Sequence, residues 1–325
     1  MSDELDEFTS QLNTAKEEDK KVLIGHTNPN PNMPVPNQNV RMTPQQAEAM
    51  KKAQEMKAKL DATPLKLDAL KGKVDLKWYG HAGFKVSFLD KDDVHRNIYV
   101  DVWVDNKDCP ADDKKAPPND VDLALVTNGA FDHSFHAPFL MMSGKREKRQ
   151  IVCTSEVGLF YEAVRKIPAQ LFAKMQPGGT KDFEWCKITM VHAESSSTCA
   201  GPQGIPMPGG AGVGFVINIP NHNISIYYTG ATNVFSDMKI IDDLYKPDMV
   251  ILPIGNMLAM GPREAAYSVK NFLPTPKRVV PMMFGTFDEL TGTVEDFEKE
   301  CKDMGVEDRE IIHPKEFFGA KAIVE

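Results

Sequence analysis

The spacing of apolar residues along this chain changes near residues 70–74. Before this point the sequence lacks the alternation of apolar and polar positions that marks β-strands. Residues 28–37 repeat proline and asparagine, and because proline removes backbone donors and favours extended backbone, neither helix nor sheet is expected there. A helix is predicted at about residues 43–61, since Thr43 can cap it and Pro44 suits its first position.

The predicted helix has a narrow apolar stripe, in which Met50, Ala53, Met56 and Leu60 recur at spacings of three and four. Such a stripe buries too little surface to fold alone, so it must lie on the main domain or on a partner. We predict that residues 1–73 form an N-terminal docking arm that binds a protein partner through Met50, Met56 and Leu60. The alternative is that the helix packs back on its own domain.

From residue 75 onwards the pattern changes to short apolar or alternating runs, which predict β-strands. These runs are residues 76–79, 84–88, 98–100, 123–126, 151–153, 188–191, 214–219, 224–228, 249–254 and 279–282. Helical spacing follows at residues 157–165, 236–244, 262–273 and 294–304. A stretch rich in glycine and proline, residues 201–214, predicts an irregular loop. We therefore predict one α/β domain over residues 74–325, a four-layer αββα sandwich of two mixed β-sheets with helices outside.

Composition and charge narrow the choice of partners. The chain of 325 residues has a net charge of −8, which gives no electrostatic reason to expect nucleic acid or an anionic membrane. The five cysteines are widely spaced and no run approaches the ~20 apolar residues that span a bilayer. With no signal peptide pattern at the start, we predict a cytoplasmic protein with reduced thiols. Its docking arm would allow it to join a larger cytosolic or cytoskeletal assembly.

Several motifs occur in an order and at a spacing that match one enzyme superfamily. The most informative are Trp78-Tyr79-Gly80-His81-Ala82-Gly83-Phe84 and Val126-Thr127-Asn128-Gly129-Ala130-Phe131-Asp132-His133, and others lie at residues 100–106, 192–197, 226–235, 252–262 and 281–287. Over about residues 76–287 the chain resembles the metallo-β-lactamase-fold hydrolases, in particular the branch of L-ascorbate 6-phosphate lactonase and its relatives. The resemblance implies the metallo-β-lactamase fold.

The departures from this family fall on its metal ligands. The resemblance implies seven ligand positions, which fall here on Asn128, Ala130, Asp132, His133, Glu194, Ala231 and Met283. Only Asp132 and His133 keep the family residue, while Glu194 keeps a possible oxygen ligand. A catalytic zinc normally has three protein ligands and a water, and neither of the family's two metal positions keeps that number. We therefore predict no catalytic residue, no metal cofactor and a catalytically degenerate pseudoenzyme that acts as a binding or structural component.

Two alternatives remain open. The first is a metal-dependent hydrolase, of lactonase or phosphoester type, with one weakly bound zinc or other divalent ion on a rearranged set of Asp132, His133 and Glu194. The second is a sensor that keeps the pocket of the family without its metals and binds a small molecule there. His136 and His192 lie near the motifs and could substitute as ligands, but a surface or hydrogen-bonded role is the simpler interpretation. His81 follows Gly80 in the first motif and could face a pocket, and a structural role for it is at least as good an interpretation.

Overall fold

The computed structural model describes residues 72–115, 118–144, 146–317 and 321–324. The predicted docking arm, its helix at residues 43–61 and the contact residues Met50, Met56 and Leu60 lie outside this range, apart from residues 72 and 73. The arm and its partner therefore stay predictions. Within the described residues, no helix is both long enough and apolar enough to cross a membrane.

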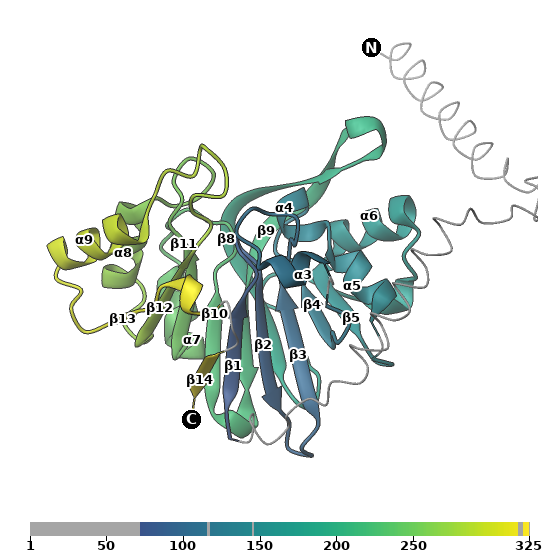
Figure 1. Cartoon of the computed structure of the whole chain (residues 1–325), viewed down its shortest axis with the longest axis horizontal. Helices are drawn as coiled ribbons and strands as arrows, with labels where there is room; N and C mark the ends of the chain where they lie inside the picture. The colour runs from purple at the N-terminus through teal and green to yellow at the C-terminus, as the bar shows by residue number, and fades with distance from the viewer. Residues whose placement is uncertain (1–71, 116–117, 145, 318–320, 325) are drawn as a thin grey trace, which may run out of the picture. The chain divides into compact units, whose positions relative to one another are not determined.

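Two seven-stranded β-sheets are formed by the described residues (Figure 1). The first has the order β14-β1-β2-β3-β4-β5-β6, with the strands β1 (Val74–Trp78), β2 (Phe84–Leu89), β3 (His95–Val100), β4 (Leu123–Leu125), β5 (Gln150–Thr154), β6 (Phe172–Met175) and β14 (Lys321–Val324). β1, β2 and β3 pair antiparallel, whereas β3 to β6 pair in parallel. The first sheet is therefore mixed, as predicted.

The second sheet has the order β13-β12-β11-β10-β9-β8-β7. Its strands are β7 (Thr180–Asp182), β8 (Lys187–Ala200), β9 (Pro206–Ile219), β10 (Ile224–Tyr228), β11 (Met249–Pro253), β12 (Arg278–Met282) and β13 (Glu310–Ile311). β7 to β10 pair antiparallel and β10 to β13 pair in parallel. This sheet is mixed as well.

The main core lies between the two sheets and follows from the alternation in the sequence. In β1, Val74, Leu76 and Trp78 are buried in this core, while the two polar residues between them are only half-buried. Phe215 of β9 contributes to the same core from the second sheet. Burying one face of each strand is what orders the sheets face to face.

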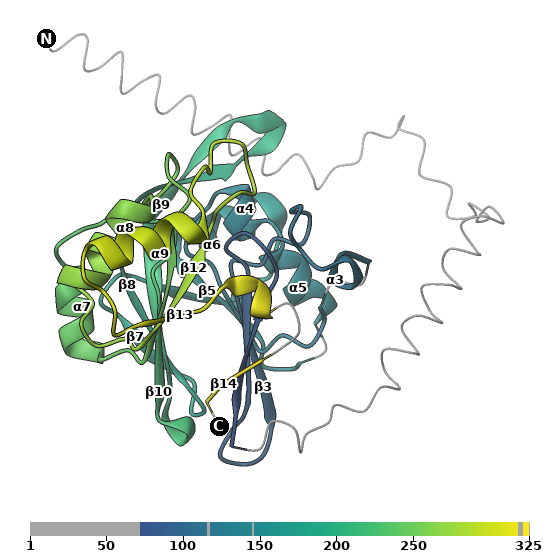
Figure 2. The same cartoon turned by 60° about the vertical axis from the view of Figure 1, so that its left-hand side comes forward.

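Helices cover the outer face of each sheet (Figure 2). On the first sheet lie α3 (Ala111–Lys115), α4 (Phe131–Ser134), α5 (Ala137–Ser143) and α6 (Ser155–Arg165), and on the second lie α7 (Met238–Tyr245), α8 (Pro262–Asn271) and α9 (Val294–Asp303). Each helical layer shares its own apolar cluster with the sheet beneath it. The predicted αββα sandwich is confirmed.

The hairpin of β8 and β9 differs from the prediction. The stretch predicted as an irregular loop, residues 201–214, is mostly strand, and the long ribbon extends past the other strands (Figure 1). Glycine makes this pairing possible, because a Cβ on Gly209 would lie 2.4 Å from the hydroxyl oxygen of Ser197. A Cβ on Gly212 would lie 2.7 Å from the Cβ of Ser195. The glycines that suggested a loop instead allow two strands to approach closely.

Candidate metal site

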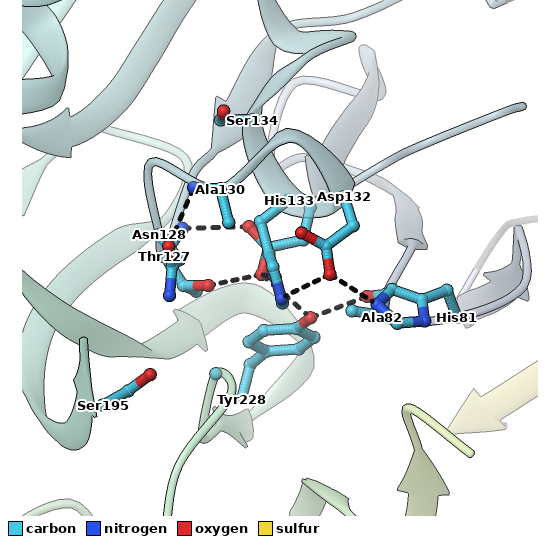
Figure 3. A network of polar contacts seen from close by, with 12 residues as sticks. His81, Ala82, Thr127, Asn128, Ala130, Asp132, His133, Ser134, Ser195 and Tyr228 are labelled. Carbon is cyan, nitrogen blue, oxygen red and sulfur yellow. Dashed lines mark hydrogen bonds and ion pairs between the residues drawn. The ribbon is translucent and has the colours of Figure 1, made fainter. Parts of the chain in front are cut away.

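Three buried side chains from two segments of the chain converge at the ends of strands of the first sheet. His81 follows β1, whereas Asp132 and His133 lie on α4, which follows β4. One ligand atom of each residue lies within 4.8 Å of the others. Figure 3 shows the three side chains pointing toward one another. This group is a candidate metal site.

Asp101 sets the orientation of the His133 ring. The ring donates a hydrogen bond from Nδ1 to Oδ2 of Asp101 over 2.8 Å, since an ionised carboxylate can only accept. Nε2 of His133 is then left facing Asp132, whose Oδ2 lies 3.6 Å away. Asp101 is fixed in turn by the backbone N–H of Thr127 at 2.9 Å and by the hydroxyl group of Tyr228 at 3.2 Å.

His81 lies on the other side of Asp132. Its Nε2 donates to Oδ2 of Asp132 over 3.0 Å, and its ring, which is 0% exposed, contacts the edges of Trp103 and Phe287. Its Nδ1 is buried and has no hydrogen-bond partner among the described residues. Because buried polar atoms are normally paired, the ring is not satisfied as a purely structural residue.

The surroundings shift the pKa values of the two histidines in opposite directions. Burial opposes the charged form of His133, but the carboxylates of Asp132 and Asp101 outweigh it and raise the pKa of His133 to about 9. Burial lowers the pKa of His81, against the opposing effect of Asp132. Burial would raise the pKa of Asp132, yet the two histidines lower it to about 2. Without a metal, His133 is therefore a cation beside an anionic Asp132, and His81 is neutral.

Three of the ten described non-glycine residues with a positive φ lie around the same group. His81, Asp101 and Met283 have φ angles of 51°, 45° and 53°, in the left-handed region that side chains disfavour. The backbone N–H of Met283 donates to the carbonyl oxygen of His81 over 3.2 Å, which ties two of these residues together. Strained residues persist where the surrounding structure holds them, and they cluster at functional sites.

Other positions at which the resemblance implies metal ligands have different roles in this structure. Asn128 donates to the carbonyl oxygen of Ser196 over 2.7 Å and accepts from the backbone N–H of Ala130 over 2.8 Å, so it shapes its loop. The side chain of Glu194 is 62% exposed and lies 3.3 Å from His192, which is also exposed. The structure therefore brings Asp132 and His133 together, but it does not add Glu194 to them.

Ala231 and Met283 are buried in the core between the sheets, with exposed fractions of 6% and 2%. His136 is buried outside the group, with its Nε2 3.6 Å from Asp105. The residue that the ligand prediction missed is His81. The signal in the sequence was its place directly after Gly80, since a glycine often marks a tight turn that positions the next residue. In the structure Gly80 has a φ of 81°, and a Cβ there would lie 2.2 Å from the side-chain oxygen of Asn106.

Two imidazoles and one carboxylate form a donor set that catalytic zinc sites use. The bond from His133 to Asp101 is the outer-shell contact that usually orients such a ligand. The unpaired Nδ1 of buried His81 also argues against a closed structural network. His81, Asp132 and His133 therefore fit a divalent ion.

Comparison with known proteins decides the family. A family described as a beta-lactamase superfamily domain matches residues 96–282, more than half of the chain. The chain belongs to this superfamily. The predicted superfamily is thereby confirmed, whereas the branch of the lactonase stays a prediction.

Curated relatives and solved structures agree with this assignment. The chain is 38% identical over 224 residues to a UPF0173 metal-dependent hydrolase of Koribacter versatilis, covering 68% of this chain and 89% of the relative. It is 37% identical over 212 residues to a relative of the same name from Chloroflexus aurantiacus, covering 65% and 84%. The solved structure of Igni18, a metallo hydrolase from Ignicoccus hospitalis, has the same fold, with a TM-score of 0.59, 22% identity and coverage of 78% and 98%.

These findings correct three predictions. The catalytically degenerate pseudoenzyme, the structural component and the absence of a metal cofactor are wrong, because relatives at this identity are named metal-dependent hydrolases. The structure also assembles a potential metal site from His81, Asp132 and His133. The prediction failed because it counted ligands only at the family's positions. His81 lies 51 residues before Asp132, and only folding brings the two together.

Proposed function

We propose that this protein is a metal-dependent hydrolase that holds one divalent ion on His81, Asp132 and His133. The observation that carries this proposal is the convergence of these three ligand atoms within 4.8 Å. The names of the curated relatives support it. The proposed activity is hydrolysis of a lactone or a phosphoester, which is the class that the resemblance implies.

A divalent ion at this site would polarise the scissile carbonyl or phosphoryl group and activate water at neutral pH. Asp101 holds the proton of His133 on Nδ1, so that Nε2 faces the site. The rings of Trp103 and Phe287 cover His81 and exclude water from that side. The carboxylate of Asp132, whose side chain is 10% exposed, lies nearest to solvent and marks the side from which substrate would enter.

Two further parts of the proposal concern the cellular compartment and a protein partner. The five cysteines are unpaired and buried, which supports a reducing compartment such as the cytoplasm. We also keep the proposal that the N-terminal arm, through Met50, Met56 and Leu60, binds a protein partner. Its support is the apolar stripe in the sequence.

The test is metal binding by the full chain, with the single variants His81→Ala and Asp132→Ala. The matched control is His192→Ala, which removes an exposed histidine of β8. We expect elemental analysis to find about one tightly held zinc, manganese or iron per chain in the wild type and the control. Both site variants should lose it, together with hydrolysis of a nitrophenyl ester or phosphodiester. Circular dichroism melting shows that each variant is folded.

Wild-type protein that holds no divalent ion after purification and metal addition would contradict the proposal. Retention of the ion by His81→Ala at wild-type affinity would also contradict it, because the ligand set would then be different.

A further inference from the structure

A second site lies next to the metal loop. A cavity of about 240 Å³ is lined by Gly129, Phe131 and Ser134 of this loop, and by residues of α5 and α6 and the end of β8. Figure 3 shows Ser134 pointing away from Asp132 and His133. The residues that line the cavity do not include His81, Asp132 or His133, so this is a separate site and the inference goes beyond the proposed function.

The walls of the cavity offer mostly apolar surface. Ser134 donates its hydroxyl hydrogen to the carbonyl oxygen of Gly129 over 2.9 Å, and Tyr161 donates to the carbonyl oxygen of Ser134. Their polar groups are thus already satisfied within the protein. A ligand in this cavity would gain little from hydrogen bonds to them and would be held by apolar contact.

The apolar side chains around the cavity are unusually open to solvent. Phe131, Phe139 and Met142 have exposed fractions of 50%, 57% and 60%. Clustered apolar exposure of this kind often marks a binding site. A cavity of ~150 Å³ lined by apolar residues is large enough to bind benzene, so this one has room for a larger ring or an alkyl chain.

Charge at the cavity comes from one residue. Arg165, in the last turn of α6, is exposed and lines the cavity. It is the only charged side chain in the lining, all of which the structure describes. Some other cations of the domain are paired; Lys174, for example, lies 2.8 Å from Glu162. A guanidinium group at the edge of an apolar cavity favours a carboxylate as its partner.

We propose that this cavity binds a carboxylate with an apolar body. The alkyl or aryl body lies between the aromatic side chains, and the carboxylate pairs with Arg165. Because Gly129 and Phe131 belong to the loop of the metal ligands, the ligand would contact that loop without touching the ligands themselves.

The test is calorimetric titration of the full chain with octanoate and, as a neutral analogue, 1-octanol. Arg165→Gln removes the charge and leaves a shorter, neutral polar side chain. The matched control is Arg263→Gln, which removes an exposed arginine on α8. Ala200→Trp fills the cavity from an exposed position at the end of β8. Thermal melting confirms that the variants are folded.

We expect wild type and Arg263→Gln to bind octanoate more tightly than octanol. Arg165→Gln should weaken octanoate binding roughly threefold to fivefold, as expected for an exposed ion pair, and leave octanol binding unchanged. Ala200→Trp should lose both ligands. Wild type that binds no octanoate, a folded Ala200→Trp that binds it normally, or equal affinity for the two ligands would overturn the proposal. None of these outcomes depends on whether a metal is bound, so the two proposals fail independently.

Discussion

Asp101 is the residue on which the geometry of the site depends most. Its carboxylate accepts hydrogen bonds from Thr127 and His133, which follow β4, and from Tyr228 of β10. It does so from a backbone with a φ of 45°, just after β3. One buried carboxylate therefore connects both sheets to the loop that carries Asp132 and His133.

Replacing Asp101 by asparagine tests this role. We expect Asp101→Asn to weaken zinc affinity ~10–100-fold, because the amide carries no charge and holds the tautomer of His133 less firmly. Competition with a chromophoric chelator measures the affinity. Asp105→Asn is the control, since that carboxylate is 67% exposed and pairs with His136 outside the group. Equal affinity in the two variants would show that Asp101 does not position the ligand.

His95 gives a prediction about pH that does not involve the metal site. Burial, and then the charge of Lys85, lower the pKa of His95 to about 4, whereas an unfolded histidine has a pKa of about 6.5. The unfolded chain thus binds more protons between these values, so stability is complete above about pH 6.5 and falls as the pH falls towards 4. Allowing for solvent screening of this partly hydrated ring, we expect a loss of about 1–2 kcal/mol.

Urea unfolding at pH 7 and pH 4.5 measures this effect in wild type and His95→Gln. The glutamine variant should lose less stability between the two pH values, because its side chain does not titrate. The difference between the proteins isolates His95 from carboxylates that titrate nearby. An equal loss in both would mean that His95 is protonated freely in the folded state.

At the scale of elements, the helices α6 to α9 follow local signals in the sequence closely, whereas α3, α4 and α5 were not predicted. The predicted helix at residues 294–304 is α9, Val294–Asp303, and the predicted helix at 262–273 is α8, Pro262–Asn271. α9 begins where it does because Thr293 accepts a hydrogen bond from the backbone N–H of Asp296 over 3.0 Å. A capping side chain and its helix are neighbours in sequence, so the pattern predicts both.

This cap can be tested by substitution. We expect Thr293→Ala to lower the free energy of unfolding by ~1 kcal/mol, because the first turn of α9 loses an acceptor. Thr293→Ser keeps the hydroxyl group and should retain most of the stability. Chemical denaturation measures all three proteins. If serine and alanine destabilise equally, the methyl group of Thr293 matters and the hydrogen bond does not.

At the scale of the whole domain, the two sheets depend on one shared core. Phe215 of β9 is fully buried there and pairs in register with Tyr228 of β10. The hydroxyl group of Tyr228 reaches Asp101 of the first sheet, so the packing of the sheets and the orientation of His133 are connected. A cavity in this core should therefore affect both stability and metal binding.

We expect Phe215→Ala to cost about 3–5 kcal/mol of stability, the usual loss for a large buried aromatic. Zinc affinity should fall as well, because Tyr228 would no longer be held in place. Leu244→Ala, at a position of α7 that is 68% exposed, is the control and should change neither quantity. Calorimetry measures the melting transition and zinc titration the affinity. Unchanged zinc affinity in a destabilised Phe215→Ala protein would show that the packing of the core does not affect the geometry of the metal site.

The sequence alone determined the layered fold, most of its strands and the helices α6 to α9, because the spacing of apolar and polar residues is a local pattern that reflects which face of an element is buried. It also identified Asp132 and His133 as the residues that keep the family's metal ligands. It could not give the ligand set, because that depends on distances between loops of different strands. Only the tertiary structure placed His81 beside Asp132, 3.0 Å apart, and left Glu194 exposed to solvent. The same folding joined Phe131 and Arg165 around one cavity, which no spacing in the sequence indicates.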